Sequence, residues 1–401
     1  MLFKTAFRNL LRNRRRTITV GLTVAIGTAS LFMFHGFNSG IMNQYQDNCV
    51  HARYGHGQIN MAGYRDKVFE KPWEHWMSGW NTMKEQLKSV AGINQVFPRI
   101  EFFGLLTNGR VTVSGKGQGI DGVEEAKFFY TMNIESGETL SNQPEGILLG
   151  RGLARALDLK PGDRVTILAN TVFGSLNAVD LYVTGVFHTG AKDFDDTVFR
   201  VPLKQAQLLL DTDKIEHVAL GLTAIEKWPQ ISKAITEKFN NVEATPFAEL
   251  DKVYYQHSVD WLNSQFGVIE AIILAIIILG IFNSVSTTLF ERKQEIGNLR
   301  ANGESVLDVA KLLALEALAL GVVSALAGIL FTYILNITVL KNGILMPPAP
   351  GLTRQFYVVI ELQWLMALKT FAMGAGVAVI GTLLAAIRVL RLPISEALRS
   401  V

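Results

Sequence analysis

The side chains that could do chemistry in this 401-residue chain are few and scattered. Two of its seven histidines, His51 and His56, lie close together, but no cluster of acids or thiols beside them completes a metal site. The run GKGQGI at 115–120 lacks the lysine–serine or lysine–threonine pair of a phosphate-binding loop and is better interpreted as a turn. No GxSxG or HExxH motif occurs. We therefore predict no catalytic and no metal-ligating residues, in a chain that is not itself an enzyme.

Two smaller features have simple interpretations. The acidic run DFDD at 193–196 indicates a short solvated turn, and calcium binding stays open as an alternative. The single cysteine, Cys49, excludes an internal disulfide and a zinc site built from thiolates. We expect Cys49 to be a small residue at the junction between a helix and a domain.

The densest charge lies in ERKQEIGNLRANGES, residues 291–305, between two very apolar stretches. Read as a helix, it gathers polar side chains on one side and leaves Ile296 and Leu299 as apolar points for a partner. Gly303 is placed to end that helix. The simpler alternative is a solvated connector. The residues that we assign to a binding surface are Glu291, Arg292, Glu295, Ile296, Leu299 and Arg300.

The elements around this segment are membrane spans. Hydrophobic residues make up 49% of the chain and the mean hydropathy is +0.24. A helix needs about 20 apolar residues to cross a bilayer. Four segments are at least that long: 17–37, 264–290, 306–336 and 364–387.

The basic leader before the first of these segments also fits a cleaved signal peptide. The apolar run is too long for a signal peptide, and we favour a retained anchor.

The distribution of lysine and arginine sets the orientation, because these residues collect on the cytoplasmic side. The first sixteen residues hold six basic side chains and no acid, whereas the loop between the last two spans holds only Lys341 and Arg354. We expect the segments 1–16, 291–305 and 388–401 in the cytoplasm, and the segments 38–263 and 337–363 outside. The net charge of +3 is too small to indicate nucleic-acid binding.

The segment 38–263 reads as a domain carried on helical stalks. The first span continues as a helix until Gly55 and Gly57, and a second helix runs from Phe247 to Phe290, about 66 Å at 1.5 Å per residue. Between them, 146–168 indicates a strand, a short helix, a Pro-Gly turn and a strand, and 179–187 a further strand. The fold class is therefore an α-helical membrane protein with four spans and a large α+β extracytoplasmic domain between the first two.

Ionisable residues within spans are functional hypotheses by default. Glu270, Lys311 and Lys369 lie near span ends, whereas Glu316 lies deeper and is a candidate contact to a neighbouring helix, for example across a dimer interface. The outer loop raises a separate question, because its prolines suit either a rigid connector or the mouth of a lateral opening. Those prolines are Pro347, Pro348 and Pro350.

The string FERKQEIGNLRANGES resembles the coupling helix of FtsX-like ABC transporter permeases, in which E-R-[RK]-x-E-I-G-x-L-R-A-x-G recurs. Asn302 departs from that pattern, since the family more often has an apolar residue there. Three further stretches are similar to the family: AFRNLLRNRRRTITV at its basic start, LARALDLKPGDRVTIL in its periplasmic core domain, and LRLPISEALRS at its end. The run 185–210 looks more like the lipoprotein-releasing permeases LolC and LolE than like the macrolide exporter MacB.

The resemblance implies an inner-membrane permease whose energy comes from elsewhere. Its partners would be a cytosolic ABC ATPase dimer that binds ATP and magnesium, a second permease that is identical or paralogous, membrane lipid, and a periplasmic carrier or adaptor. The chain itself would bind no cofactor. Glu295 and Arg300 would contact the ATPase, and the cargo would be a lipid or lipoprotein. The alternatives are a MacB-like peptide or drug exporter and an FtsX-like activator of a cell-wall hydrolase.

Overall fold

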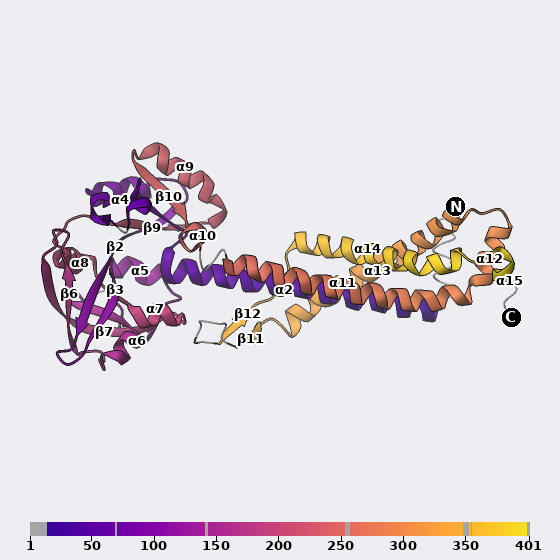
Figure 1. The fold of residues 1–401 in the computed structure, drawn as a ribbon, viewed down its shortest axis with the longest axis horizontal. Coiled ribbons are helices and arrows are strands. Elements are labelled where there is room, and N and C mark those ends of the chain that lie inside the picture. The colour runs from indigo at the N-terminus through magenta and orange to yellow at the C-terminus, as the bar shows by residue number, and fades with distance from the viewer. Residues whose placement is uncertain are drawn as a thin grey trace. The chain divides into compact units, whose positions relative to one another are not determined.

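The computed structural model of the chain describes residues 14–68, 70–140, 143–252, 257–347, 353 and 355–398. These residues form two compact units, which we treat separately (Figure 1). The helical unit consists of the described residues up to 43, together with 259–346 and 357–398. The inserted domain consists of the described residues of 44–258 and 347–356.

The helical unit contains the four predicted spans. Within the described residues, four helices are long and apolar enough to cross a membrane. They are α2 (Arg14–Cys49), α11 (His257–Glu291), α13 (Val306–Thr338) and α14 (Trp364–Leu390). The shorter elements of this part of the chain are α12 (Lys293–Ala301), α15 (Ile394–Leu398), β11 (Ile344–Met346) and β12 (Phe356–Val358), whose first residue belongs to the inserted domain.

Small residues let these helices approach closely. A Cβ added at Gly328 of α13 would stand 2.4 Å from the carbonyl oxygen of Ala25 in α2. A Cβ at Gly374 of α14 would stand 2.3 Å from the hydroxyl oxygen of Thr28. Such contacts are typical of membrane helices, which pack through small side chains because lipid tails are as apolar as the helices themselves.

The inserted domain is built from short strands and helices. Its strands are β1 (Gly57–Met61), β2 (Ile93–Thr107), β3 (Thr112–Ile120), β4 (Asn133–Gly137), β5 (Gly146–Gly150), β6 (Arg164–Asn170), β7 (Leu176–His188), β8 (Val198–Pro202), β9 (His217–Leu222) and β10 (Val242–Pro246). Its helices are η1 (Val50–Tyr54), α3 (Tyr64–Lys67), η2 (Pro72–His75), α4 (Trp80–Lys88), α5 (Gly122–Phe128), α6 (Arg151–Ala156), α7 (Lys192–Thr197), α8 (Leu203–Leu210), η4 (Ile225–Lys227), α9 (Trp228–Lys238) and α10 (Phe247–Leu250).

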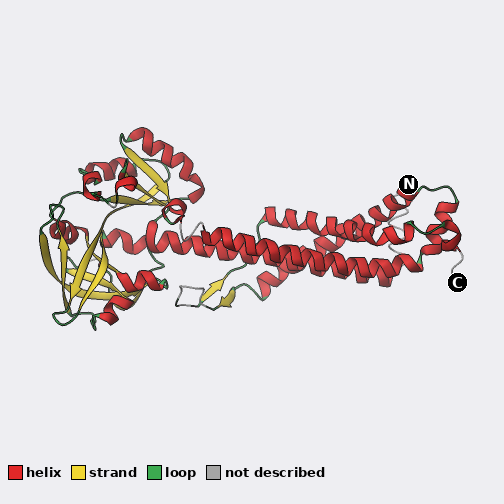
Figure 2. Ribbon diagram, in the orientation of Figure 1, coloured by secondary structure: helices red, strands yellow, loops and turns green. Residues whose placement is uncertain are grey.

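All these strands join one mixed sheet, in the order β10-β1-β9-β2-β3-β8-β5-β7-β4, with β6 pairing with both β2 and β7. Among the strand pairs of this sheet formed by the described residues, β3–β8 and β5–β7 are parallel and the others are antiparallel. The long strand β2 connects two halves: its first residues pair with β9, and its later residues pair with β3 and β6. Figures 1 and 2 show these halves, one with α4, α9 and β10 and the other with α6, β6 and β7.

The local predictions for the inserted domain are confirmed in detail. Strand β5, helix α6, the turn at Pro161 and Gly162, and strand β6 follow one another as expected, and Gly162 has a φ of 96°. The first long helix, with its last turn as η1, ends at Gly55 as predicted. Gly55 has a φ of 69°, a conformation that glycine adopts without strain. A Cβ there would also stand only 2.8 Å from the carbonyl oxygen of Leu220.

The predicted continuous helix from Phe247 to Phe290 is wrong at Asp251. Helix α10 ends at Leu250, residues 253–256 lie outside the described residues, and α11 is described from His257. Asp251 leaves the helical conformation with a φ of −104° and a ψ of 30°. Its carboxylate accepts hydrogen bonds from Tyr54 Oη, at 3.2 Å, and from Cys49 Sγ, at 3.7 Å. These side-chain contacts accompany the interruption and cannot be recognised from helical spacing.

The tight crossing at Gly328 can be tested by adding a single methyl group. We expect Gly328→Ala to destabilise the full-length protein in detergent by about 1–3 kcal/mol, because the new Cβ meets backbone rather than a flexible side chain. The control is Gly376→Ala in α14, where a Cβ has nothing within 4 Å. Since alanine is the better helix former, the control should be neutral or slightly stabilising. Equal thermal unfolding of the two variants would contradict the account.

Candidate functional site

The charged segment forms a helix with well-defined ends. Helix α12 stops where Gly303 adopts a φ of 100°, as its predicted role as a helix stop requires. The Gly303 N–H donates to Arg300 O and the Glu304 N–H donates to Leu299 O, each at 3.2 Å, which is the pattern of a Schellman cap. Asn302 is the exposed C-cap residue of this helix. An apolar side chain at 302 would therefore meet solvent or a partner, not the chain's own core.

One face of α12 is exposed and polar. Its exposed residues follow helical spacing, and Ala301 is the only apolar one among them. The polar side predicted from the sequence is therefore confirmed, and Gln294 is added to it. The exposed residues from the end of α11 through the end of α12 are Glu291, Gln294, Glu295, Asn298, Ala301 and Asn302.

The apolar residues of α12 face the chain itself. Ile296 is only 4% exposed and belongs to the same core cluster as Leu289, Leu313 and Val389, and Leu299 packs against that cluster. The prediction that Ile296 is open to a partner is therefore wrong, whereas Leu299 is only half-buried. The physical reason is that a helix of nine residues gains most of its stability from packing an apolar face.

The end of the chain braces α12. Arg300 Nη1 donates to the carbonyl oxygens of Leu390, at 3.3 Å, and Leu392, at 2.7 Å. A Cβ on Gly297 would stand 3.0 Å from Cβ of Ala397 in α15, so the glycine permits this close contact. Arg300 is half-buried, and its acceptors are the last carbonyl of α14 and a carbonyl two residues beyond it. The expected contact of Arg300 with an ATPase stays a prediction.

A second arginine joins α12 to the helix that follows it. Arg292 Nε donates to Glu295 at 2.9 Å, and Arg292 Nη1 donates to Glu316 at 3.2 Å. Glu316 is buried, so a charged partner is what its carboxylate requires. Its contact is with Arg292, the N-cap residue of α12 in the same chain. A contact of Glu316 across a dimer interface stays a prediction. Lys311 pairs with Asp308 at 3.5 Å and not with Glu316.

Glu270, another acidic residue of the spans, belongs to a small polar cluster. Glu270 of α11 lies 3.3 Å from Nε2 of His35 in α2, and His35 Nδ1 lies 3.1 Å from the hydroxyl of Thr370 in α14. Three helices are thereby joined by polar contacts. Lys369, the neighbour of Thr370, is exposed.

The outer loop contacts the inserted domain. The Thr353 N–H donates to Gly190 O at 2.8 Å, and both residues belong to that domain. Pro347 is exposed, whereas Pro348 and Pro350 lie outside the described residues. The Thr353 contact favours the interpretation of this loop as a tethered connector.

The remaining polar candidates have structural roles. Asp195 is buried in α7 and accepts hydrogen bonds from Thr189 and Gly190, so the expectation of a solvated acidic turn is wrong for this residue. His56 Nδ1 accepts from the Leu222 N–H, and burial lowers the pKa of His56 to about 4. His51 lies 3.0 Å from the Phe128 carbonyl oxygen. Among the described residues, no three His, Cys, Asp or Glu side chains gather closely enough to hold a metal ion.

The hydrogen bonds from Arg300 to Leu390 O and Leu392 O should hold the end of the chain in place, and one substitution tests this. Arg300→Gln should loosen the segment 391–398, because charge-assisted hydrogen bonds are worth about 1.5–3 kcal/mol. Amide hydrogen exchange there should become about ten- to hundredfold faster. The control, Arg388→Gln, changes an exposed arginine in the last turn of α14 and should leave exchange unchanged. Exchange that is equally slow in both variants would show that Arg300 does not hold the end of the chain.

Comparison with known proteins gives these features a context. Residues 267–394 match the family model of the FtsX-like permease C-terminal region, and residues 17–238 match that of the MacB-like periplasmic core domain. The periplasmic region of MacB from Actinobacillus actinomycetemcomitans is a similar solved structure, with 11% identity, 49% of this chain and 90% of that chain covered, and a TM-score of 0.37.

Two relatives are similar over most of their length. The lipoprotein-releasing system transmembrane protein LolE of Haemophilus influenzae is 24% identical, over 96% of this chain and 93% of that protein. LolC of Neisseria meningitidis serogroup B is 27% identical, over 78% of this chain and 73% of that protein. The chain has four apolar helices with a domain between the first two, and one family model matches residues 17–238 while the other matches residues 267–394. The chain therefore belongs to the FtsX-like and MacB-type family of ABC transporter permeases.

Proposed function

We propose that this chain is the permease subunit of an ABC transporter and that it extracts a lipid or lipoprotein from the membrane on the periplasmic side. A separate cytosolic ATPase supplies the energy, with ATP and magnesium bound by that partner. The observation that carries the proposal is the exposed polar face of α12, which is backed by α15 and by the ion pair between Arg292 and Glu316. A surface held rigidly to the spans can transmit a push from a soluble partner.

The charge distribution supports placing this face in the cytoplasm. Basic residues flank α12, the first span and the last span, where they are expected on the cytoplasmic side. The same rule puts both termini inside and the inserted domain in the periplasm of an inner membrane. The protein would then present α12 to the ATPase and the inserted domain to the periplasm.

The partners follow from the family. Relatives that are permeases of the lipoprotein-releasing system imply an ABC ATPase and a second permease, identical or paralogous. Four spans enclose little space, which also favours a pair of permeases. Lipid or lipoprotein is the favoured cargo because the relatives that align over most of the chain carry that name. A periplasmic carrier or adaptor would receive it.

Asn298 gives the sharpest test of the ATPase surface. It lies on the exposed face of α12, and substituting it disturbs neither the Arg292 ion pairs nor the Arg300 brace. We expect Asn298→Arg to weaken binding of the ATPase to the full-length permease about 30-fold, as loss of a central contact worth about 2 kcal/mol would do. Binding can be measured in nanodiscs, together with ATP-driven release of acylated cargo.

The matched control is Lys341→Glu, a charge reversal at an exposed residue between α13 and β11. It should leave ATPase binding unchanged. Assembly and transport by Asn298→Arg at the level of the unaltered protein would remove the basis for assigning α12 to the ATPase.

The cargo can be identified by mass spectrometry of the complex trapped during turnover. We expect acylated species to co-purify with it and to decrease when ATP is added together with an acceptor. If the complex hydrolyses ATP and no lipid-anchored species is recovered, the cargo proposal fails. Capture of a cell-wall hydrolase by the complex would instead favour the FtsX-like alternative, and capture of a drug-efflux adaptor the MacB-like one.

A further inference from the structure

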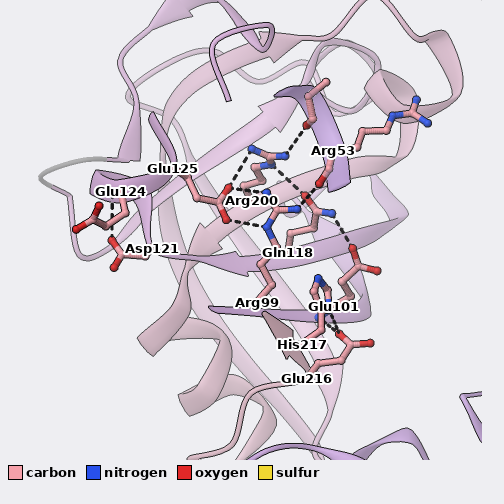
Figure 3. A network of polar contacts seen from close by, with 11 residues as sticks. Arg53, Arg99, Glu101, Gln118, Asp121, Glu124, Glu125, Arg200, Glu216 and His217 are labelled. Atoms are coloured by element: carbon pink, nitrogen blue, oxygen red, sulfur yellow. Dashed lines mark hydrogen bonds and ion pairs between the residues drawn. The ribbon is translucent and has the colours of Figure 1, made fainter. Parts of the chain in front are cut away.

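The last turn of the first long helix is held by two fully buried arginines. This turn, η1, is a π-helical segment, a form that is rare and frequent at functional sites. The carbonyl oxygens at a helix end lack partners within the helix. Arg99 Nη1 donates to Arg53 O, and Arg200 Nη2 donates to Ala52 O at 3.2 Å. Figure 3 shows both guanidinium groups beside this turn.

A single carboxylate serves both arginines. Arg99 Nε and Nη2 donate to the two oxygens of Glu125 in α5, at 2.7 and 2.9 Å, which is a bidentate pair. Arg200 Nη1 lies 3.5 Å from the same carboxylate. All three side chains are at most 2% exposed. Two cations and one anion leave an excess of positive charge, which faces the negative end of the helix dipole.

Further contacts fix the position of Arg200. Its Nε donates to Gln118 at 3.0 Å, and the Gln118 amide donates to Glu101 at 2.8 Å. Burial lowers the pKa of Arg200 to about 10, so its guanidinium stays charged at neutral pH. Burial acts to raise the pKa of Glu101, but the charges of Lys116 and His217 and hydrogen bonds from Lys116 and Gln118 together outweigh burial and lower this pKa to about 2. Arg200 and Glu101 therefore keep their charges throughout the neutral range.

The two arginines reach both halves of the sheet. Arg99 is the last residue of β2 that pairs with β9, opposite His217, and Ile100 is the first that pairs with β3. Arg200 is in β8, on the other side of β3. A movement of η1 would therefore reach each half through a charged hydrogen bond.

The returning chain is tied to the same turn. Asp251, which follows α10, accepts hydrogen bonds from Tyr54 in η1 and from Cys49 just before it. Cys49 therefore lies at the junction of helix and domain, as predicted, and its thiol also donates a hydrogen bond to Asp251. These hydrogen bonds join Asp251, near the end of the segment 44–258, to residues near its start.

We propose that Arg99, Glu125 and Arg200 form a joint that passes displacement of α2 to both halves of the inserted domain. The inference rests on the proposed function, since ATP binding by the ATPase that contacts the α12 face must supply the displacement. These are positioning residues, because they act through the carbonyls of η1 and do not touch cargo. Loss of the joint should leave ATP hydrolysis intact and separate it from movement of the domain.

The test is Arg200→Met in the full-length permease, purified with the ATPase that associates with it. This variant keeps the ion pair of Arg99 and Glu125, whose charges cancel, and removes the hydrogen bond from Arg200 to Ala52 O. Hydrogen exchange is measured with and without a non-hydrolysable ATP analogue. In the unaltered protein we expect the analogue to change exchange in both 50–57 and 198–202 by about tenfold. In Arg200→Met the change should persist in 50–57 and fall below about twofold in 198–202.

Two further variants separate the joint from general stability. Arg155→Met removes an exposed arginine of the same domain and should respond like the unaltered protein. Arg200→Lys keeps the charge and one donor, so it should restore part of the response in 198–202. It also serves as the test variant if Arg200→Met does not fold.

The outcomes distinguish the two proposals. An unchanged response of 198–202 in Arg200→Met, with ATP hydrolysis intact, would overturn the joint and leave the proposed function standing. If Arg200→Met does not fold, an unchanged response in Arg200→Lys would overturn it in the same way. If the unaltered protein binds the ATPase but neither segment responds to the analogue, the proposed coupling itself is overturned, and the joint with it.

Discussion

The packing of α12 against α15 and the ends of the spans is the constraint on which the proposed coupling depends. A helix of nine residues is marginal in isolation, so its shape must come from contacts with the rest of the chain. Ile296 supplies the buried anchor, Gly297 allows the close approach of Ala397, and Arg300 ties the turn to the carbonyls that end α14. Once that side is fixed, the opposite side has one orientation, and its polar residues form a defined surface.

The same physical device appears in the inserted domain. Arginine side chains satisfy the free carbonyls at the end of α14, through Arg300, and at the end of η1, through Arg99 and Arg200. A guanidinium group suits this task because it carries five donors in a rigid fork and remains charged when buried. The two settings differ in burial, since Arg300 is half-buried and the other two are fully buried.

Much of the fold could be predicted from the sequence because it depends on local signals. Span length, the end of the first long helix at Gly55 and the strand–helix–strand unit at 146–168 follow from apolar runs, glycines and alternation. The polar side of α12 followed from helical spacing. The burial of its apolar side could not be predicted, because spacing places Ile296 on an apolar face but cannot show whether a partner or the ends of the chain's own spans cover that face.

The buried charges were missed for a related reason. Arg99 and Arg200 interrupt the apolar runs VFPRI and VFRVP, and a charge within a buried strand is the one signal that could have marked them. Their partners are 26 or more residues away in the sequence, so pairing could not be read from spacing. Asp251 is similar, since its contacts with Cys49 and Tyr54 span about two hundred residues of chain and accompany the end of α10.

A footprint of the ATPase on the full-length permease tests the central claim most directly. Hydrogen exchange of the permease in nanodiscs is compared with and without the purified ATPase. We expect slower exchange in 291–305 and in the exposed part of α15, and no change in 337–347. Protection confined to other segments, with 291–305 unaffected by the bound ATPase, would contradict the claim.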